Sequence, residues 1–209
     1  GDHPEYLRVA ACAKHFAVHS GPESLRHTFD AQVSPKDLFE TFLPAFRALV
    51  TEGKVEAVMG AYNRTNGELC CASPTLLQKI LRDEWGFSGH VVSDCGAIAD
   101  FHLHHRVTST PAESAALAVN NGCDLNCGKV FFALREAVEQ GLISEETIDR
   151  SLARLLRTRF KLGMFDPPEK VPYAQIPYEI VACPEHRAHA RKVARESMVL
   201  LKNANNLLP

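Results

Sequence analysis

The stretch GHVVSDCGA, Gly89–Ala97, carries the clearest signal of the fold class in this sequence. Its first half is a short apolar run of the kind that forms a buried strand, and its second half places the carboxylate of Asp94 where that strand ends. Strands that are apolar throughout, without polar alternation, are typical of parallel sheets covered by helices. The stretch therefore predicts one strand of a parallel sheet, with Asp94 at its carboxyl end.

Similar apolar runs recur along the chain and alternate with amphipathic helices. The expected strands are 8–18, 55–62, 89–94 and 123–126. Ser34-Pro35 and Ser73-Pro74 each open a helix, because Ser is a favoured cap and Pro is favoured at the first helical position. The expected helices are 35–53, 74–86, 111–119, 130–140, 145–161 and 185–201. This alternation predicts an α/β fold.

Polar residues gather where the expected strands end, as at Lys14-His15, Tyr62-Asn63 and Asp124–Asn126. Functional residues of a (β/α)8 barrel lie at this end of its strands. A doubly wound dinucleotide-binding sheet would carry G-x-G-x-x-G after its first strand, and the sequence has no such motif. We therefore expect a partial (β/α)8 TIM-type barrel, made of the last βα units, over residues 1–165.

Residues 166–209 differ from the rest of the chain because prolines cluster at their start. Proline-rich segments adopt extended conformations and often connect domains. A helix and an apolar run follow the prolines. We expect residues 166–209 to be a linker and the start of a second α/β domain that lies outside this chain.

Composition excludes several classes of function. The chain has 209 residues, 45% hydrophobic and 23% charged, with a net charge of −2. A nucleic-acid partner is not expected, because such proteins present a basic face. A membrane partner is not expected either, because no apolar run approaches the roughly 20 residues that cross a bilayer.

The seven cysteines are expected to be reduced. Five of them lie in apolar or strand-like segments: Cys12, Cys70, Cys71, Cys95 and Cys123. Free cysteine behaves as a small apolar residue and is often buried, so these residues are expected to be buried thiols.

Asp94 is the first candidate for chemistry. A carboxylate at a strand's end, close to Gly96, suits a nucleophile or a base, although an Asp that only caps the next turn would look the same. Lys14 and His15 are the second candidate, because adjacent hydrogen-bond donors suit a ligand with neighbouring hydroxyl groups. The alternative is an unrelated exposed lysine beside a buried histidine.

Three motifs together resemble glycoside hydrolase family 3: KHF at Lys14–Phe16, MGAYN at Met59–Asn63 and VVSDC at Val91–Cys95. The segments Gly122–Leu125 and Val199–Asn203 are also similar to that family. The resemblance implies a retaining exo-β-glycosidase without a cofactor, acting on oligosaccharides or aryl glycosides. Members are often periplasmic or secreted, but the residues of this chain leave the compartment open.

The resemblance also implies roles for individual residues. Asp94 would be the nucleophile, and Lys14 and His15 would hold sugar hydroxyls. Met59 and Tyr62 would line the first sugar subsite, with the Tyr62 hydroxyl aimed at the nucleophile.

Cys95 bears on the substrate, because many members carry Trp at this position and the Ser-Asp-Cys form looks most like the β-xylosidase branch. A β-xylosidase is therefore expected, with a β-glucosidase as the first alternative. A carbohydrate-binding relic that has lost catalysis is the second. The acid/base would come from the following domain of the same parent chain, so the 209-residue piece alone is expected to be inactive.

Two further histidine features carry weaker hypotheses. One branch of the family pairs a loop His with an Asp two residues earlier; His27 has the matching offset here, but Leu25 takes the place of the Asp. Without a carboxylate to orient it, His27 would be a poor acid, which argues against an N-acetylhexosaminidase. No metal site is expected either, because His102, His104 and His105, like Cys123 and Cys127, lack the spacing of a typical zinc site.

Overall fold

The computed structural model describes residues 3–19 and 21–207, which fall into two units, Gly1–Phe165 and Asp166–Pro209. All strands found among these residues belong to the first unit. Nowhere in the described part of the chain is a helix both long and apolar enough to cross a bilayer.

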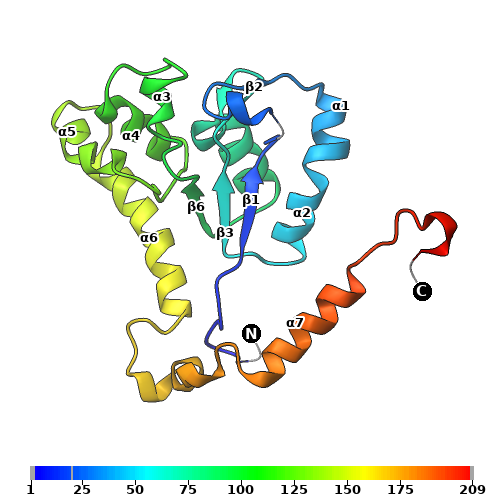
Figure 1. The fold of residues 1–209 in the computed structure, drawn as a ribbon. Coiled ribbons are helices and arrows are strands. Elements are labelled where there is room, and N and C mark those ends of the chain that lie inside the picture. Colours follow the sequence, from blue (N-terminus) through cyan, green and yellow to red (C-terminus); the bar gives the residue numbers. More distant parts are fainter. Residues whose placement is uncertain (1–2, 20, 208–209) are drawn as a thin grey trace. The chain divides into compact units, whose positions relative to one another are not determined.

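The first unit is built on a parallel sheet in the order β1-β3-β6, and a small second sheet joins β2, β4 and β5 (Figure 1). The strands are β1 (Cys12–Phe16), β2 (Asp30–Ala31), β3 (Ala57–Gly60), β4 (Arg64–Thr65), β5 (Glu68–Leu69) and β6 (His90–Ser93). Phe16 pairs with Gly60, and Gly60 pairs with Ser93. The three main strands therefore end at one edge of the sheet, which confirms the α/β fold with parallel strands.

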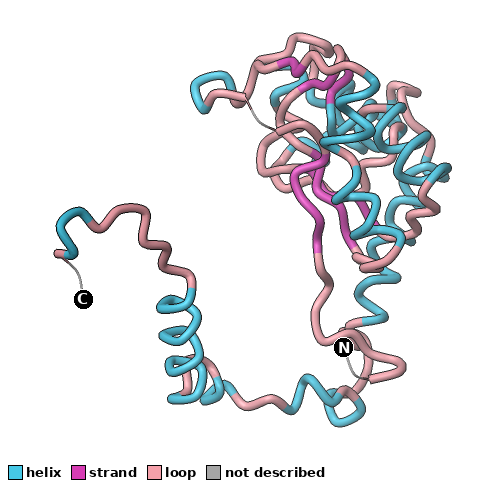
Figure 2. Tube along the Cα trace, turned by 90° about the vertical axis from the view of Figure 1, so that its right-hand side faces the viewer, coloured by secondary structure: helices cyan, strands magenta, loops and turns pink. Residues whose placement is uncertain are grey.

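Helices flank this sheet. The α-helices are α1 (Pro35–Asp37), α2 (Pro44–Thr51), α3 (Asp100–Leu103), α4 (Pro111–Asn120), α5 (Leu134–Glu139), α6 (Glu145–Lys161) and, in the second unit, α7 (Pro184–Glu196). Wider helical turns occupy Leu38–Phe42 and Pro74–Glu84. Within the first unit α2 packs against β1 and α6 against β6, at the two ends of the strand order. In Figure 2 strands of the sheet, in magenta, run beside helices of the first unit.

The two Ser-Pro helix openings are confirmed. The Ser34 hydroxyl accepts a hydrogen bond from the Asp37 backbone N–H, and Ser73 does the same for Leu76. The hydrophobic core that these helices close holds fully buried Phe16 and Val91 from the sheet, together with Leu77 and similar helix residues. Each buried side chain of this size contributes about 1.5–3 kcal/mol to folding.

Two helices are shorter or less continuous than the sequence predicts. The helix 35–53 is interrupted at Pro44, because proline has no N–H to complete the helical ladder; the turn Leu38–Phe42 before it widens. The last helix ends at Glu196 and does not reach residue 201. At this end the Ser197 N–H makes a backbone hydrogen bond to the Val193 carbonyl. The apolar run that follows lacks the one-sided pattern of a surface helix.

The expected strand 123–126 is wrong. Leu125 forms only an isolated parallel bridge with Val92. The backbone N–H groups of Asp124 and Leu125 both donate to the Val91 carbonyl, and the Ser93 N–H donates to the Leu125 carbonyl, so the pairing with β6 is limited to this one bridge. The expected strand 8–18 exists, but only as the five residues of β1.

Candidate active site

Asp94 lies where β6 ends, at the edge shared by the three parallel strands. Its backbone N–H donates to the Gly60 carbonyl at the end of β3, 3.1 Å away. Its side chain is 14% exposed, so the carboxylate is largely enclosed but reachable. One carboxylate oxygen, Oδ1, accepts from the Cys95 backbone N–H at 2.8 Å, which fixes its orientation.

The second oxygen of Asp94 faces His15, which projects from β1. The distance from His15 Nε2 to Asp94 Oδ2 is 3.3 Å. Burial lowers the pKa of His15, and the charge of Asp94 opposes that shift only in part. The pairing of β1 with β3 shifts between Ala13 and Phe16, and such irregularities re-aim side chains. The sheet edge thus brings together Asp94 and His15, as the sequence suggested.

In the described part of the chain, Lys14 and Met59 form no hydrogen bond or ion pair with the Asp94 carboxylate. Lys14 is exposed. It borders, together with His15, a hollow of about 250 Å³. Met59 is half-buried in β3, where it pairs with Val92 of β6.

Tyr62 follows β3 and is 9% exposed. Its hydroxyl donates to the Cys95 carbonyl at 2.6 Å, one residue beyond Asp94. Burial raises the pKa of Tyr62, and the negative charge of Asp94 adds to that effect. The hydroxyl therefore remains a hydrogen-bond donor and holds the backbone that carries the carboxylate.

A disulfide joins Cys95 to Cys127, so the expectation that Cys95 is a reduced thiol is wrong. The Ser93 hydroxyl binds the loop that carries Cys127: it receives hydrogen bonds from the Asn126 side chain at 3.2 Å and from the Cys127 N–H at 3.0 Å. These contacts bring the two cysteine Cα atoms to 4.5 Å, within the range that a disulfide requires. The result is a covalent crosslink directly after Asp94.

The other cysteines follow the expectation with one exception. Cys70, Cys71 and Cys123 are buried free thiols, and burial raises the pKa of Cys70 to about 11. Cys12 is free but exposed, so its expected burial is wrong. Its place on β1, the end strand of the sheet, leaves it uncovered by a further strand.

His27 has a carboxylate partner that sequence spacing did not reveal. Its Nδ1 lies 2.7 Å from Asp100 Oδ2, across 73 residues of chain. His27 therefore has an orienting carboxylate, contrary to the expectation from sequence: Asp100 of α3 takes the role that Leu25 cannot. The other oxygen of Asp100 lies 2.6 Å from His104 Nδ1.

The remaining histidines of that region have different partners. His102 Nδ1 lies 2.9 Å from the Ser114 hydroxyl, and His105 Nε2 lies 3.0 Å from the Tyr62 carbonyl. Of the three neighbouring histidines 102, 104 and 105, only His104 lies with Asp100 and His27.

Asp124 is a structural residue. Its side chain is fully buried, and its Oδ2 receives hydrogen bonds from Arg82 at 2.8 Å and from the Val91 N–H at 2.9 Å. Its Oδ1 receives hydrogen bonds from Ser151 and Arg154, both at 2.9 Å. Asp124 thereby ties β6 to α6 and to the helix Pro74–Glu84.

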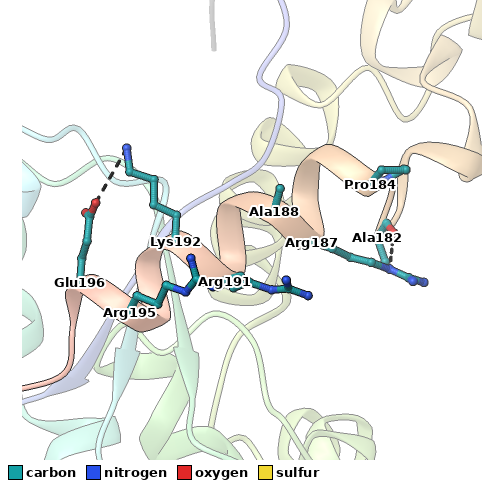
Figure 3. A pocket seen from close by; sticks show the side chains of 8 residues that line it. All are labelled: Ala182, Pro184, Arg187, Ala188, Arg191, Lys192, Arg195 and Glu196. Atoms are coloured by element: carbon teal, nitrogen blue, oxygen red, sulfur yellow. Dashed lines mark hydrogen bonds and ion pairs between the residues drawn. The ribbon is translucent and has the colours of Figure 1, made fainter. Parts of the chain in front are cut away.

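The second unit contains a cavity of about 810 Å³ along α7 (Figure 3). Its lining residues are Ala182, Pro184, Arg187, Ala188, Arg191, Lys192, Arg195 and Glu196. The long side chains are exposed, and the ion pair between Lys192 and Glu196 is loose, at 3.9 Å. Its lining holds no nucleophile and no buried polar group, so nothing in it indicates a catalytic site.

The chemistry available at the sheet edge is that of an oriented carboxylate. One oxygen of Asp94 is held by the Cys95 backbone N–H, the other lies 3.3 Å from His15 Nε2, and the side chain is partly open, as a nucleophile requires. Among the described residues, its polar contacts include no second carboxyl group. An acid that would act with it is therefore not identified at this edge.

Comparisons with known proteins point to one family. The model of the glycosyl hydrolase family 3 N-terminal domain matches residues 3–158. The matched part is thus the family's N-terminal domain, and the match does not report the expected assignment to the last βα units of the barrel. A xylan 1,4-beta-xylosidase of Xylanibacter ruminicola is 47% identical over 207 residues, covering 98% of this chain and 24% of the relative.

Solved structures give the same picture. A GH3 exo-beta-xylosidase, XlnD, in complex with a xylobiose aziridine probe has a TM-score of 0.91 at 33% identity, covering 99% of this chain and 28% of that one. A β-glucosidase from Erythrobacter marinus has a TM-score of 0.86 at 34% identity, covering 98% of this chain and 27% of that one. The chain therefore spans about a quarter of the length of the proteins it matches.

Proposed function

The chain belongs to glycosyl hydrolase family 3, and from this premise we propose that it carries the nucleophile of a retaining exo-β-xylosidase. The observation that carries the proposal is the placement of Asp94 at the sheet edge, 3.3 Å from His15. Both residues lie in the motifs by which the sequence resembles the family.

In the proposed reaction a carboxylate oxygen of Asp94 bonds to the anomeric carbon of the terminal sugar through an oxocarbenium-like transition state while the glycosidic C–O bond breaks, and the acid/base group protonates the departing oxygen. The same group then takes a proton from the water that displaces Asp94 from the covalent glycosyl-enzyme, and the sugar leaves with its configuration retained. Lys14 and His15 hold sugar hydroxyls from the β1 side, and Met59 and Tyr62 line the subsite from β3. Tyr62 also restrains the backbone behind the nucleophile, through its hydrogen bond to the Cys95 carbonyl.

The acid/base is proposed to come from another part of a longer parent protein. Retaining hydrolysis needs a second carboxyl group about 5–5.5 Å from the first, and the resemblance to the family implies that this group comes from the domain that follows. The matched xylosidase of Xylanibacter ruminicola is about four times as long, since the chain covers 24% of it. We therefore propose that the parallel sheet is part of a (β/α)8 barrel completed by segments outside 1–165. Residues 166–209 lead to a following domain, and that domain supplies the acid. The 209-residue piece alone is then inactive.

A xylose-releasing activity is favoured over a glucose-releasing one by the name of the 47%-identical relative and by the XlnD structure. The Cys95–Cys127 crosslink is proposed to form part of the sugar pocket, because it directly follows the nucleophile. A β-glucosidase remains the second candidate, supported by the likeness to the Erythrobacter marinus enzyme.

The test is a side-by-side assay of the full-length protein on aryl β-xyloside, β-glucoside and α-arabinofuranoside. The xyloside should have the highest kcat/KM, and Asp94→Asn should abolish turnover of all three. A higher kcat/KM on the glucoside would favour the second candidate. Full activity of Asp94→Asn would refute the proposal, and no turnover by the wild-type protein would favour a carbohydrate-binding relic.

A further inference from the structure

Outside the residues assigned above, three metal-ligating side chains converge beside the candidate active site. His27 lies in the loop between β1 and β2, and Asp100 and His104 lie on and just after α3. One nitrogen from each imidazole and one oxygen of Asp100 all lie within 4.8 Å of one another. Two segments distant in sequence thus place two imidazoles and a carboxylate around one point.

The carboxylate of this cluster is buried and its imidazoles are accessible. The side chain of Asp100 is 5% exposed, whereas those of His27 and His104 are 48% and 45% exposed. In the described part of the chain, the hydrogen bonds of the Asp100 carboxylate go to these two imidazoles alone, at 2.7 and 2.6 Å. A buried carboxylate is stable only when it is paired or coordinates a metal, so Asp100 requires a cationic or donating partner on this side.

The ligand set has the composition of a transition-metal site. Two imidazoles and one carboxylate suit zinc and its neighbours in the first transition row, and a fourth position is left for water. Zinc bonds of about 2.0–2.1 Å place tetrahedral ligand atoms about 3.3 Å apart. The three ligand atoms already lie within 4.8 Å of one another, and the two rings that would have to move closer are half-exposed.

From this geometry we infer that His27, Asp100 and His104 form a site for one divalent transition-metal ion. Each imidazole coordinates the ion through Nδ1 and carries its proton on Nε2, so the ion replaces the two hydrogen bonds between the carboxylate and the imidazoles. It also braces the neighbouring subsite, because the His27 ring packs edge-on against Tyr62 with ring centroids 5.1 Å apart. The inference goes beyond the proposed hydrolysis and does not depend on it.

The test measures metal binding on the full-length protein, freed of metal by a chelator. Calorimetric titration with Zn²⁺ should give a component of one ion per chain, and Co²⁺ should give visible d–d absorption that Zn²⁺ removes. His104→Gln and Asp100→Asn should each weaken this component by at least about tenfold, since even outer-shell changes cost 10–100-fold. His102→Gln is the matched control, because its ring contacts Ser114 instead, and it should bind as the wild type does.

Each outcome bears on the inference. Circular dichroism and the thermal midpoint will establish that the variants are folded; His104→Gln changes a half-exposed side chain, and His27 remains as the other hydrogen-bond partner of Asp100. Absence of Co²⁺ absorption in the wild type would overturn the site, leaving a hydrogen-bonded trio. Equal affinity in wild type, His104→Gln and Asp100→Asn would also overturn it, because the ion would then bind elsewhere. Neither result depends on glycosidase activity.

Discussion

Replacing Asp124 by Ala should strongly destabilise the first unit. The substitution leaves the guanidinium of Arg82, whose side chain is 9% exposed, without its anion, and removes one partner of the 27%-exposed Arg154. Breaking a buried ion pair on one side costs about 3–5 kcal/mol, because an uncompensated charge stays buried. The Val91 N–H and the Ser151 hydroxyl lose their acceptor as well. We therefore expect a loss of about 4 kcal/mol in the free energy of unfolding.

Urea denaturation of the wild type and of Asp124→Ala measures this loss. Unfolding is followed by amide hydrogen exchange in the peptides that cover residues 74–84 and 145–161. The matched control is Glu146→Ala. It removes an ion pair with Arg150 that is 2.9 Å long, like the pair between Arg154 and Asp124, but exposed on α6. That pair should contribute only about 0.3–0.5 kcal/mol. A loss below about 1 kcal/mol for Asp124→Ala, or a loss equal to that of the control, would refute the reasoning that burial makes Asp124 a structural residue.

Three other expectations concern the site. Replacing both Cys95 and Cys127 by Ser should cost roughly 3–4 kcal/mol of stability, from the loop of 32 residues that the bridge closes; an unchanged urea midpoint would contradict it. The pKa of His15, measured in an NMR pH series, should lie below its ordinary value of 6.5, because burial disfavours the charged ring. The free energy of unfolding should then fall as the pH drops below 6.5, because the unfolded chain binds the proton more readily than the folded one. A His15 pKa above 6.5 would contradict the explanation by burial. Tyr62→Phe should lower the free energy of unfolding by about 1 kcal/mol, since the Cys95 carbonyl loses the hydroxyl that donates to it at 2.6 Å. It should also lower kcat at least tenfold with little change in KM. An unchanged kcat would show that this hydrogen bond does not position Asp94.

The sheet was predictable because its information is local. Continuous apolar runs at β1, β3 and β6 gave the strands, and parallel pairing follows from the helices between them. The Ser-Pro pairs located two helix starts for an equally local reason, since the cap contacts a backbone N–H three residues ahead. Pro44 carried a local signal too, and the break that it causes could have been expected.

The contacts that complete the site were hidden because they join residues distant in sequence. Nothing near Cys95 points to Cys127, and nothing near His27 points to Asp100, 73 residues away. Asp124 looked like a functional residue at a strand end, yet its partners on two helices make it a buried ion-pair centre. Only the folded chain shows which polar residues at strand ends face the sheet edge and which are buried.

The most direct test of the account is covalent trapping of the nucleophile. The full-length protein would be incubated with a 2-fluoro-xyloside bearing a good leaving group, digested, and the labelled peptide located by mass spectrometry. Our account predicts one sugar on Asp94, in the peptide spanning the end of β6. A label on any other carboxylate, or turnover of the xyloside without label on Asp94, would contradict it.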